Sequence, residues 1–213
     1  ITTGSSAITG AFANSASATL RVAQLDGCCS TATLNVANGF TNAGLIELSN
    51  QTVNNYGAQL NVVGTLVNAV GATIASLGGQ TPGGSRGLAT DLDNLGTLTV
   101  EAPPILSGAG ATHQNSGIVD VSVADLTILQ SGASPSFTNT GTVTVGTTRT
   151  LLLQGGTFLH SSATLDGTGL LSLFNTTLTL GTPLSNATLQ LNVAGSTING
   201  TATLTNAPAS TLS

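Results

Sequence analysis

The chain has 213 residues and a formal net charge of −5, with three Lys or Arg and eight Asp or Glu. Only 5% of its residues are charged, against about 25% in an average globular domain. Nucleic-acid binding needs clustered cations that replace phosphate counterions, and three isolated arginines without any lysine exclude it. No run approaches about 18 consecutive apolar residues, so we expect no membrane insertion.

The apolar residues are nevertheless plentiful and ordered. They make up 40% of the chain, the mean hydropathy is +0.35, and Val, Ile and Leu recur in patterns that argue against disorder. The surface must then be covered by Thr, Ser, Asn, Gln and Gly, which hydrate it without charging it. Such a surface fits an extracellular protein better than a cytosolic enzyme.

Two adjacent cysteines, Cys28 and Cys29, follow Asp26 and Gly27 near the start of the chain. Neighbours on a regular strand point to opposite faces, so these two thiols cannot bond to each other there. Two disulfide uses stay open: a strained vicinal ring at a turn, or one buried thiol and one exposed thiol that bridges to another chain. The pattern matches neither a metal motif nor Cys-x-x-Cys.

A repeated nine-residue segment dominates the middle of the chain. It reads Phe/Leu/His-x-Asn-x-Gly-x-Ile/Leu/Val-x-Leu/Val and occurs at Phe40–Leu48, Leu92–Val100, His113–Val121 and Phe137–Val145, with a looser copy from Leu66 to Gly71. One parity is apolar and the other is variable and Thr-rich, which is the period of a half-buried strand and not of a helix.

The asparagine of this segment falls at Asn42, Asn68, Asn94, Asn115 and Asn139, so successive copies are separated by about two dozen positions. An inward-facing amide at a coil corner can bond to its copies above and below, so we predict a structural asparagine ladder. We expect the glycine two residues later to permit a bend or a positive φ at the same corner.

These spacings predict an all-β fold: a single-chain, right-handed parallel β-helix of about nine coils, each of roughly 21–26 residues, with almost no helix. An Ala-Thr-Leu tag that recurs at 163 and 187, one average coil length apart, supports the coil length. Residues 1–213 form one array in this interpretation, and the Gly- and Pro-rich residues 78–88 form a loop that protrudes from a corner. The alternative is a β-sandwich, which would have less regular spacing and more aromatic residues.

Neither end of the chain carries the polar cap that a solenoid needs, so we expect the segment to be part of a longer chain. The Phe-x-Asn-x-Gly-x-Val/Ile-x-Val repeat resembles the repetitive regions of bacterial filamentous-haemagglutinin-like and autotransporter adhesins. The resemblance covers about residues 15–205, and it implies a right-handed β-helix exported to the bacterial cell surface.

Individual reactive residues give little support for catalysis. His113 occupies the Phe position of the repeat and His160 ends an apolar run, so both are expected to be structural. Asp91 and Asp93 are one strand period apart, as a glycosidase pair or a calcium site would require, with Glu101, Asp120 and Asp125 as candidate neighbours in other coils. Solvated outward charge explains these acids equally well, and we predict no catalytic residue, cofactor or metal.

The sequence therefore predicts an extracellular structural or adhesive β-solenoid, a rigid stalk or filament subunit at a bacterial cell surface. Its expected partners are copies of itself or adjoining repeats stacked end to end, and surface glycans. One alternative is a carbohydrate-active β-helix such as a tailspike-like glycan depolymerase. Another is an ice-binding solenoid, which we disfavour because the outward residues of the four repeat segments do not form the same Thr pair on successive coils.

Overall fold

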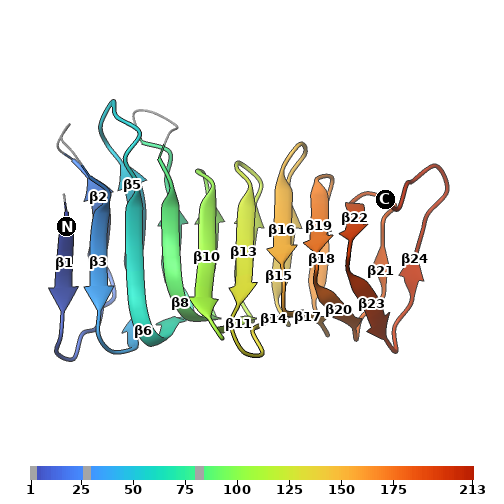
Figure 1. Ribbon diagram of the computed structural model, residues 1–213, viewed down its shortest axis with the longest axis horizontal. Coiled ribbons are helices and arrows are strands. Elements are labelled where there is room, and N and C mark those ends of the chain that lie inside the picture. Colours follow the sequence, from blue (N-terminus) through green and yellow to red (C-terminus); the bar gives the residue numbers. More distant parts are fainter. Residues whose placement is uncertain (1–3, 26–29, 80–83) are drawn as a thin grey trace.

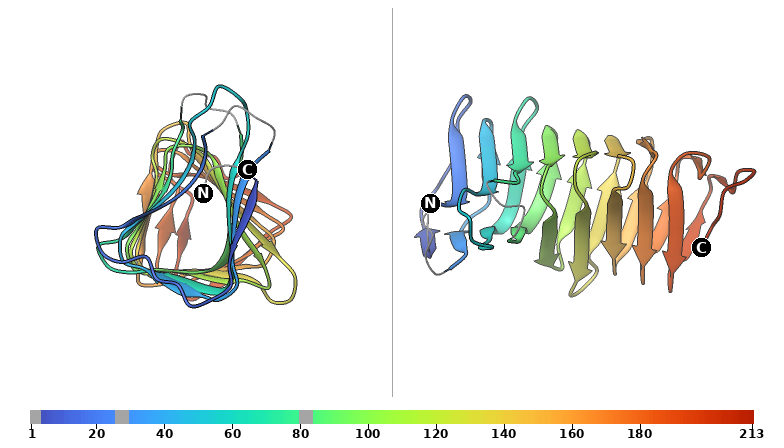
Figure 2. Two further views of the ribbon diagram at one scale, coloured as in Figure 1. Left: turned by 90° about the vertical axis from the view of Figure 1, so that its left-hand side faces the viewer. Right: turned by 90° about the horizontal axis from the view of Figure 1, so that it is seen from above.

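The computed structural model describes residues 4–25, 30–79 and 84–213, and these residues form 24 β-strands and no helix. The strands stack in parallel along one axis, so the chain is an all-β parallel β-solenoid that climbs about eight turns. Figure 1 shows the coils side by side from the N-terminal to the C-terminal end. The view along the axis shows a three-sided cross-section (Figure 2, left). This confirms the predicted fold class.

Each side of the coil is a parallel sheet. Face 1 is formed by β1 (Ser5–Ile8), β3 (Ala32–Val36), the first half of β6 (Ala58–Asn68), the first half of β8 (Arg86–Asn94), β10 (Pro104–Ala109), β13 (Leu126–Ser131), β16 (Thr150–Gln154), β19 (Leu170–Phe174) and β22 (Gln190–Ala194). Face 2 is formed by β4 (Phe40–Asn42), the second halves of β6 and β8, β11 (Thr112–Asn115), β14 (Ser136–Asn139), β17 (Thr157–His160), β20 (Thr177–Leu180) and β23 (Thr197–Gly200).

Face 3 is formed by β2 (Thr19–Gln24), β5 (Leu45–Asn50), β7 (Thr73–Ser76), β9 (Thr97–Val100), β12 (Ile118–Val121), β15 (Thr142–Val145) and β18 (Thr164–Gly167). A separate parallel pair, β21 (Leu184–Ser185) and β24 (Leu204–Thr205), takes the same place in the last two coils. Nine strands therefore lie along face 1, close to the predicted coil number.

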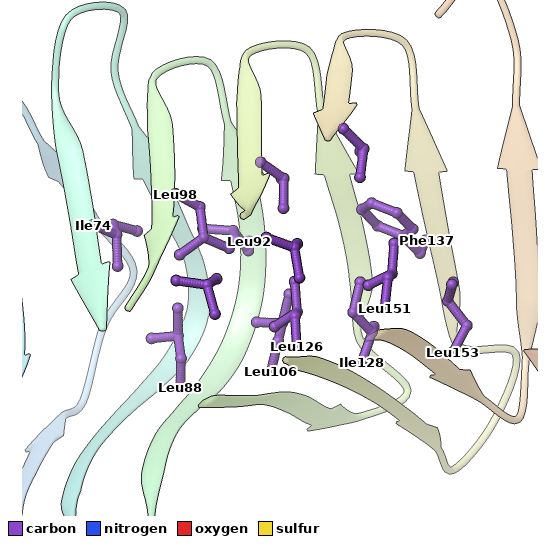
Figure 3. Packing of buried hydrophobic residues seen from close by; sticks show 14 of the residues in the cluster. Ile74, Leu88, Leu92, Leu98, Leu106, Leu126, Ile128, Phe137, Leu151 and Leu153 are labelled. Atoms are coloured by element: carbon purple, nitrogen blue, oxygen red, sulfur yellow. The ribbon is translucent and has the colours of Figure 1, made fainter. Parts of the chain in front are cut away.

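The core is a column of aliphatic and phenyl side chains that point inward from all three faces. Figure 3 shows residues of this column, among them Leu88 from face 1, Phe137 from face 2 and Leu98 from face 3, along the centre of the stack. On face 2 the rings of Phe137 and Phe158 stack with centroids 5.2 Å apart. Alternate residues of each strand point outward, as the period of two predicts.

The coil length varies more than the sequence spacing predicted. Along face 2 the first step, Asn14 to Asn42, takes 28 residues, whereas the last two steps, from His160 to Leu180 and from Leu180 to Gly200, take 20 each. The Ala-Thr-Leu tags at 163 and 187 are therefore not one coil apart. The second tag lies in the turn before β22, so its spacing matched the average coil length by coincidence.

The predicted loop 78–88 is too long at its C-terminal end. Strand β8 begins at Arg86, because Arg86 and Leu88 pair with β6 on one side and with β10 on the other. Residues 78–79 and 84–85 lie outside strands, and residues 80–83 are outside the described residues. A second long corner segment, residues 51–57 between β5 and β6, lies at the same corner between faces 3 and 1.

The repeat glycines lie at the predicted bend of the corner, but their backbone is not left-handed. None of Gly44, Gly96, Gly117 and Gly141 has a positive φ. Instead, the main chain of the preceding coil passes so close that a Cβ on Gly117 would collide with the carbonyl oxygen of Gly96, well inside 3.0 Å, and one on Gly141 would collide with that of Gly117. Glycine is needed here because the coils are in close contact, and not because the backbone is left-handed.

Candidate functional site: the asparagine column and the outer faces

The five predicted asparagines form one buried column at the corner between faces 2 and 3. Each Nδ2 amide donates to the Oδ1 of the asparagine in the following coil: the distances are 2.8 Å from Asn42 to Asn68, 2.7 Å from Asn68 to Asn94, 2.7 Å from Asn94 to Asn115 and 2.8 Å from Asn115 to Asn139. None of the five is more than 1% exposed. All the amides therefore point in one direction along the axis.

The second amide proton of each asparagine is also used. Asn68 donates to the main-chain carbonyl of Thr97 at 3.1 Å, and Asn94 donates to that of Ile118 at 3.0 Å. In each case the acceptor lies three residues after the next asparagine, where face 3 begins. The column therefore joins each corner to the strand of the next coil, and it satisfies polar groups that burial would otherwise leave unpaired.

The column extends beyond the predicted residues at both ends. Asn14 donates to Oδ1 of Asn42 at 2.7 Å and is 5% exposed. At the other end the Asn139 amide lies 3.4 Å from Nδ1 of His160, which occupies the next asparagine position. The similarity of Phe158-x-His160 to Phe137-x-Asn139, one coil earlier, is the signal that reveals this position.

Beyond His160 the same inward position holds Leu180 and then Gly200, so the last coils lack the column. A shorter copy begins at another corner, where Asn186 donates to Oδ1 of Asn206 at 2.7 Å. Both asparagines follow Leu-x, at Leu184 and Leu204, which resembles the start of the main repeat.

His113 is a neutral core residue. It fills the Phe position between Leu92 and Phe137, is 1% exposed, and its Nδ1 accepts a hydrogen bond from the main-chain N–H of Leu92 at 3.3 Å. The Nε2 atom is buried and has no hydrogen-bond partner. Burial lowers the pKa of the imidazole from 6.5 to about 4, against a smaller opposing effect of the Asp91 carboxylate. Burial also lowers the pKa of His160.

Arg86 is a buried cation that the sequence did not single out. Its side chain is 0% exposed and lies at the start of β8. The guanidinium donates to the main-chain carbonyls of Leu77, Gly78 and Gly84 at 2.7–3.0 Å. Burial lowers its pKa. Arg86 therefore fixes the two ends of the long corner segment before β8.

The acids are spread over different faces and act as local hydrogen-bond acceptors. Asp91 and Asp93 share the outward side of β8 on face 2, as their spacing predicts. Asp91 accepts from the N–H of Thr112 at 3.1 Å, and Asp125 accepts from the N–H of Thr150 at 2.9 Å. Asp120 lies on face 3 and accepts from the N–H of Ser122 at 3.0 Å. Glu101 is exposed after the end of β9. These positions do not bring the five acids together.

No group of three or more His, Cys, Asp or Glu within the described residues is arranged to hold a metal ion. Cys28 and Cys29 lie outside the described residues, so the disulfide prediction stays a prediction. Over the same described ranges, no helix is long and apolar enough to cross a membrane.

The ion pair between Arg21 and Glu47, with Nε and Oε2 2.6 Å apart, joins the outward sides of β2 and β5 on face 3. The first coils thus carry charge and long corner segments on their surface. The outer side of face 2 in the last coils carries mainly hydroxyl groups.

Comparison with known proteins gives no further guide to function. No protein-family model matches this chain, and no curated protein and no solved structure matches it.

Proposed function

We propose that the chain is an extracellular structural or adhesive β-solenoid, a rigid stalk or filament subunit at a bacterial cell surface. The observation that carries the proposal is the unbroken stack of coils held by the buried asparagine column from Asn14 to Asn139. Long-range contacts between adjacent coils dominate the structure, so the stack is stabilised by neighbour interactions, as in other repeat rods.

The surface chemistry is consistent with this role. It is hydrated by Thr, Ser, Asn and Gln side chains, and 5% of the residues are charged. Such a surface stays soluble outside the cell and leaves hydroxyl and amide groups available to surface glycans.

Edge strands at the two ends of the stack favour end-to-end partners. Among the described strands, β2 pairs only with β5, β23 pairs only with β20, and β24 pairs only with β21. At the C-terminal end the main chain of Leu191 forms a bridge with Leu212, which places the last residues on face 1 next to β22. Open main-chain groups of this kind pair with a further coil, from a copy of the chain or from adjoining repeats.

Electron microscopy tests the proposal. We expect the purified chain to form rods or filaments whose long axis is the stacking axis, with their length growing with concentration. Polysaccharide turnover is measured on the same sample. Discrete trimeric particles that cleave a polysaccharide would contradict the proposal and support the carbohydrate-active alternative.

A further inference from the structure

The outer side of face 2 carries a regular two-column array in its last five coils. The first column is Thr112, Ser136, Thr157, Thr177 and Thr197, and the second column is Gln114, Thr138, Leu159, Thr179 and Asn199. Every member of the first column has a β-hydroxyl. The repeat segments began one residue after this column, and the coil length changed along it, so the sequence spacing did not reveal it.

The array is geometrically regular. The four strand pairs from β11 to β23 each run over four residues in continuous register, without the irregularity that interrupts the pairing of β6 with β8. Strands in a sheet are about 4.8 Å apart, and residues i and i+2 of one strand are about 6.7 Å apart. Beneath the array the stacked rings of Phe137 and Phe158 support two adjacent rows.

The array is uncharged and its first column is uniform in its β-hydroxyls, whereas its second column combines two threonines with Gln114, Leu159 and Asn199. No charged or aromatic side chain stands in its ten positions, and the acids of face 2, Asp91 and Asp93, lie in the preceding coil. Threonine is stiff at χ1, so neighbouring rows present hydroxyl and methyl groups at fixed positions. The Thr179 hydroxyl donates to Oδ1 of Asn199 at 2.8 Å, which links two rows.

The outer sides of faces 1 and 3 carry charged or large apolar side chains in the same coils. On face 3 the outward column Asp120, Thr144, Asp166 brings two carboxylates into the last rows. On face 1 the outward side of the same coils carries large apolar groups, including Phe174, which is 44% exposed, and Leu152. Only face 2 combines hydroxyl groups, neutrality and regular register.

We propose that this face 2 array binds ice, as a function additional to that of the stalk. The two repeats of the array are close to the oxygen repeats along the a and c axes of hexagonal ice, so ordered water on the hydroxyls can continue into the lattice. A glycan is the less suitable ligand, because sugar rings are usually held by an aromatic side chain or in a groove, and the array has no aromatic residue.

Inhibition of ice recrystallisation by the full chain tests the inference. We expect the wild-type chain to inhibit recrystallisation and to partition into growing ice. Thr157→Tyr places a bulky ring in the middle of the array and is expected to abolish the inhibition at a concentration where the wild type inhibits fully. Thr164→Tyr is the matched control, since Thr164 is an exposed, outward threonine of the same coil on face 3, and it is expected to keep the activity.

Leu159→Thr provides a gain-of-function test. It completes the second column in its central row, so we expect inhibition at a lower concentration than for the wild type. Thermal unfolding of each variant separates loss of the surface from loss of the fold. An inactive wild-type chain, or equal loss in Thr157→Tyr and Thr164→Tyr at unchanged stability, would overturn ice binding. Neither result bears on the stalk proposal, which depends on rods seen by microscopy.

Discussion

The first six coils and the last three are held together differently at the corner between faces 2 and 3. In the first six, a buried amide at each corner between faces 2 and 3 bonds to the next coil, from Asn14 to Asn139. In the last three, the same position holds His160, Leu180 and Gly200, and the step between coils is shorter than any step along the asparagine column.

The difference shows that parallel pairing and an apolar core are sufficient to stack these coils, since both continue without the amide column. The column adds a directional, fully satisfied polar network to the first coils. These are also the coils that carry the long corner segments, the buried Arg86 and the ion pair. The regular hydroxyl array lies on face 2 of the last five coils, so it begins in the last two coils of the asparagine column.

The largest loss of stability is expected when one amide is removed from the middle of the column. Asn94→Leu leaves the Asn68 amide without its side-chain acceptor and the Asn115 Oδ1 without its donor, both buried. Each orphaned group costs about 1–3 kcal/mol, so we expect a loss of roughly 4 kcal/mol in the free energy of unfolding. Denaturant titration measures it.

The control for this variant is an asparagine pair on the outer surface. Asn61 donates to Oδ1 of Asn35 at 2.8 Å on face 1, where both side chains are only partly buried. Water can replace the lost partner there, so Asn35→Leu should cost less than about 1 kcal/mol. Equal losses of unfolding free energy for Asn94→Leu and Asn35→Leu would show that burial does not strengthen the contribution of the column to stability.

The imidazole of His113 predicts a pH dependence in the asparagine-rich half. Above about pH 6.5 the folded and unfolded imidazoles are both neutral, whereas between pH 6.5 and about 4 only the unfolded one takes up a proton. The free energy of unfolding should therefore fall by about 3 kcal/mol over that range. His113→Phe removes this contribution, and the difference between the two stability–pH curves isolates it from the carboxylates. Parallel curves would contradict a neutral, buried His113.

Close contact between coils predicts a smaller effect of a single methyl group. A Cβ at position 117 would collide with the main-chain oxygen of Gly96, and neither backbone can move easily, so Gly117→Ala should cost about 2 kcal/mol. Gly10→Ala is the matched control, because nothing lies within 4 Å of the Cβ that it adds. Thermal unfolding compares the two, and a neutral Gly117→Ala would show that the coils can separate locally.

The smallest effect is expected for the ion pair of the first coils. The Arg21 side chain is 49% exposed and that of Glu47 is 10% exposed, so only the arginine is well solvated. Glu47→Gln should change the free energy of unfolding by less than about 1 kcal/mol, and the change should shrink in high salt. A larger, salt-independent loss would mean that the ion pair has a structural role in these coils.

The sequence predicted the features that repeat with a constant chemical signature. The Asn-x-Gly segments indicated the strand, its inward side and the parallel stack, because their asparagines recur at nearly regular intervals over four steps. His160 was not predicted as part of the column because a histidine interrupts the asparagine series. Asn14 was not predicted because its coil is 28 residues long. The Phe-x-His pattern of Phe158 and His160 marks the first of these positions in the sequence, whereas Asn14 is recognised only when the register between coils is known.

The glycine role and the hydroxyl array depend on distances between coils, which spacing alone does not contain. A glycine required by a close carbonyl and a glycine required by a positive φ look the same in a sequence. The column from Thr112 to Thr197 crosses coils of unequal length, so no single period aligns it. The buried role of Arg86 was not predicted, because a cation that bonds to main-chain carbonyls has no characteristic sequence pattern.

Exchange of the asparagine side-chain amide protons with D2O tests most directly whether the buried column is hydrogen-bonded and closed to solvent in the first six coils. In a chain labelled with ¹⁵N at asparagine, we expect the Nδ2 protons of Asn42, Asn68, Asn94 and Asn115 to persist long after those of exposed asparagines such as Asn199 have exchanged. Exchange of all the side-chain amides at the rate of the exposed ones would contradict the column.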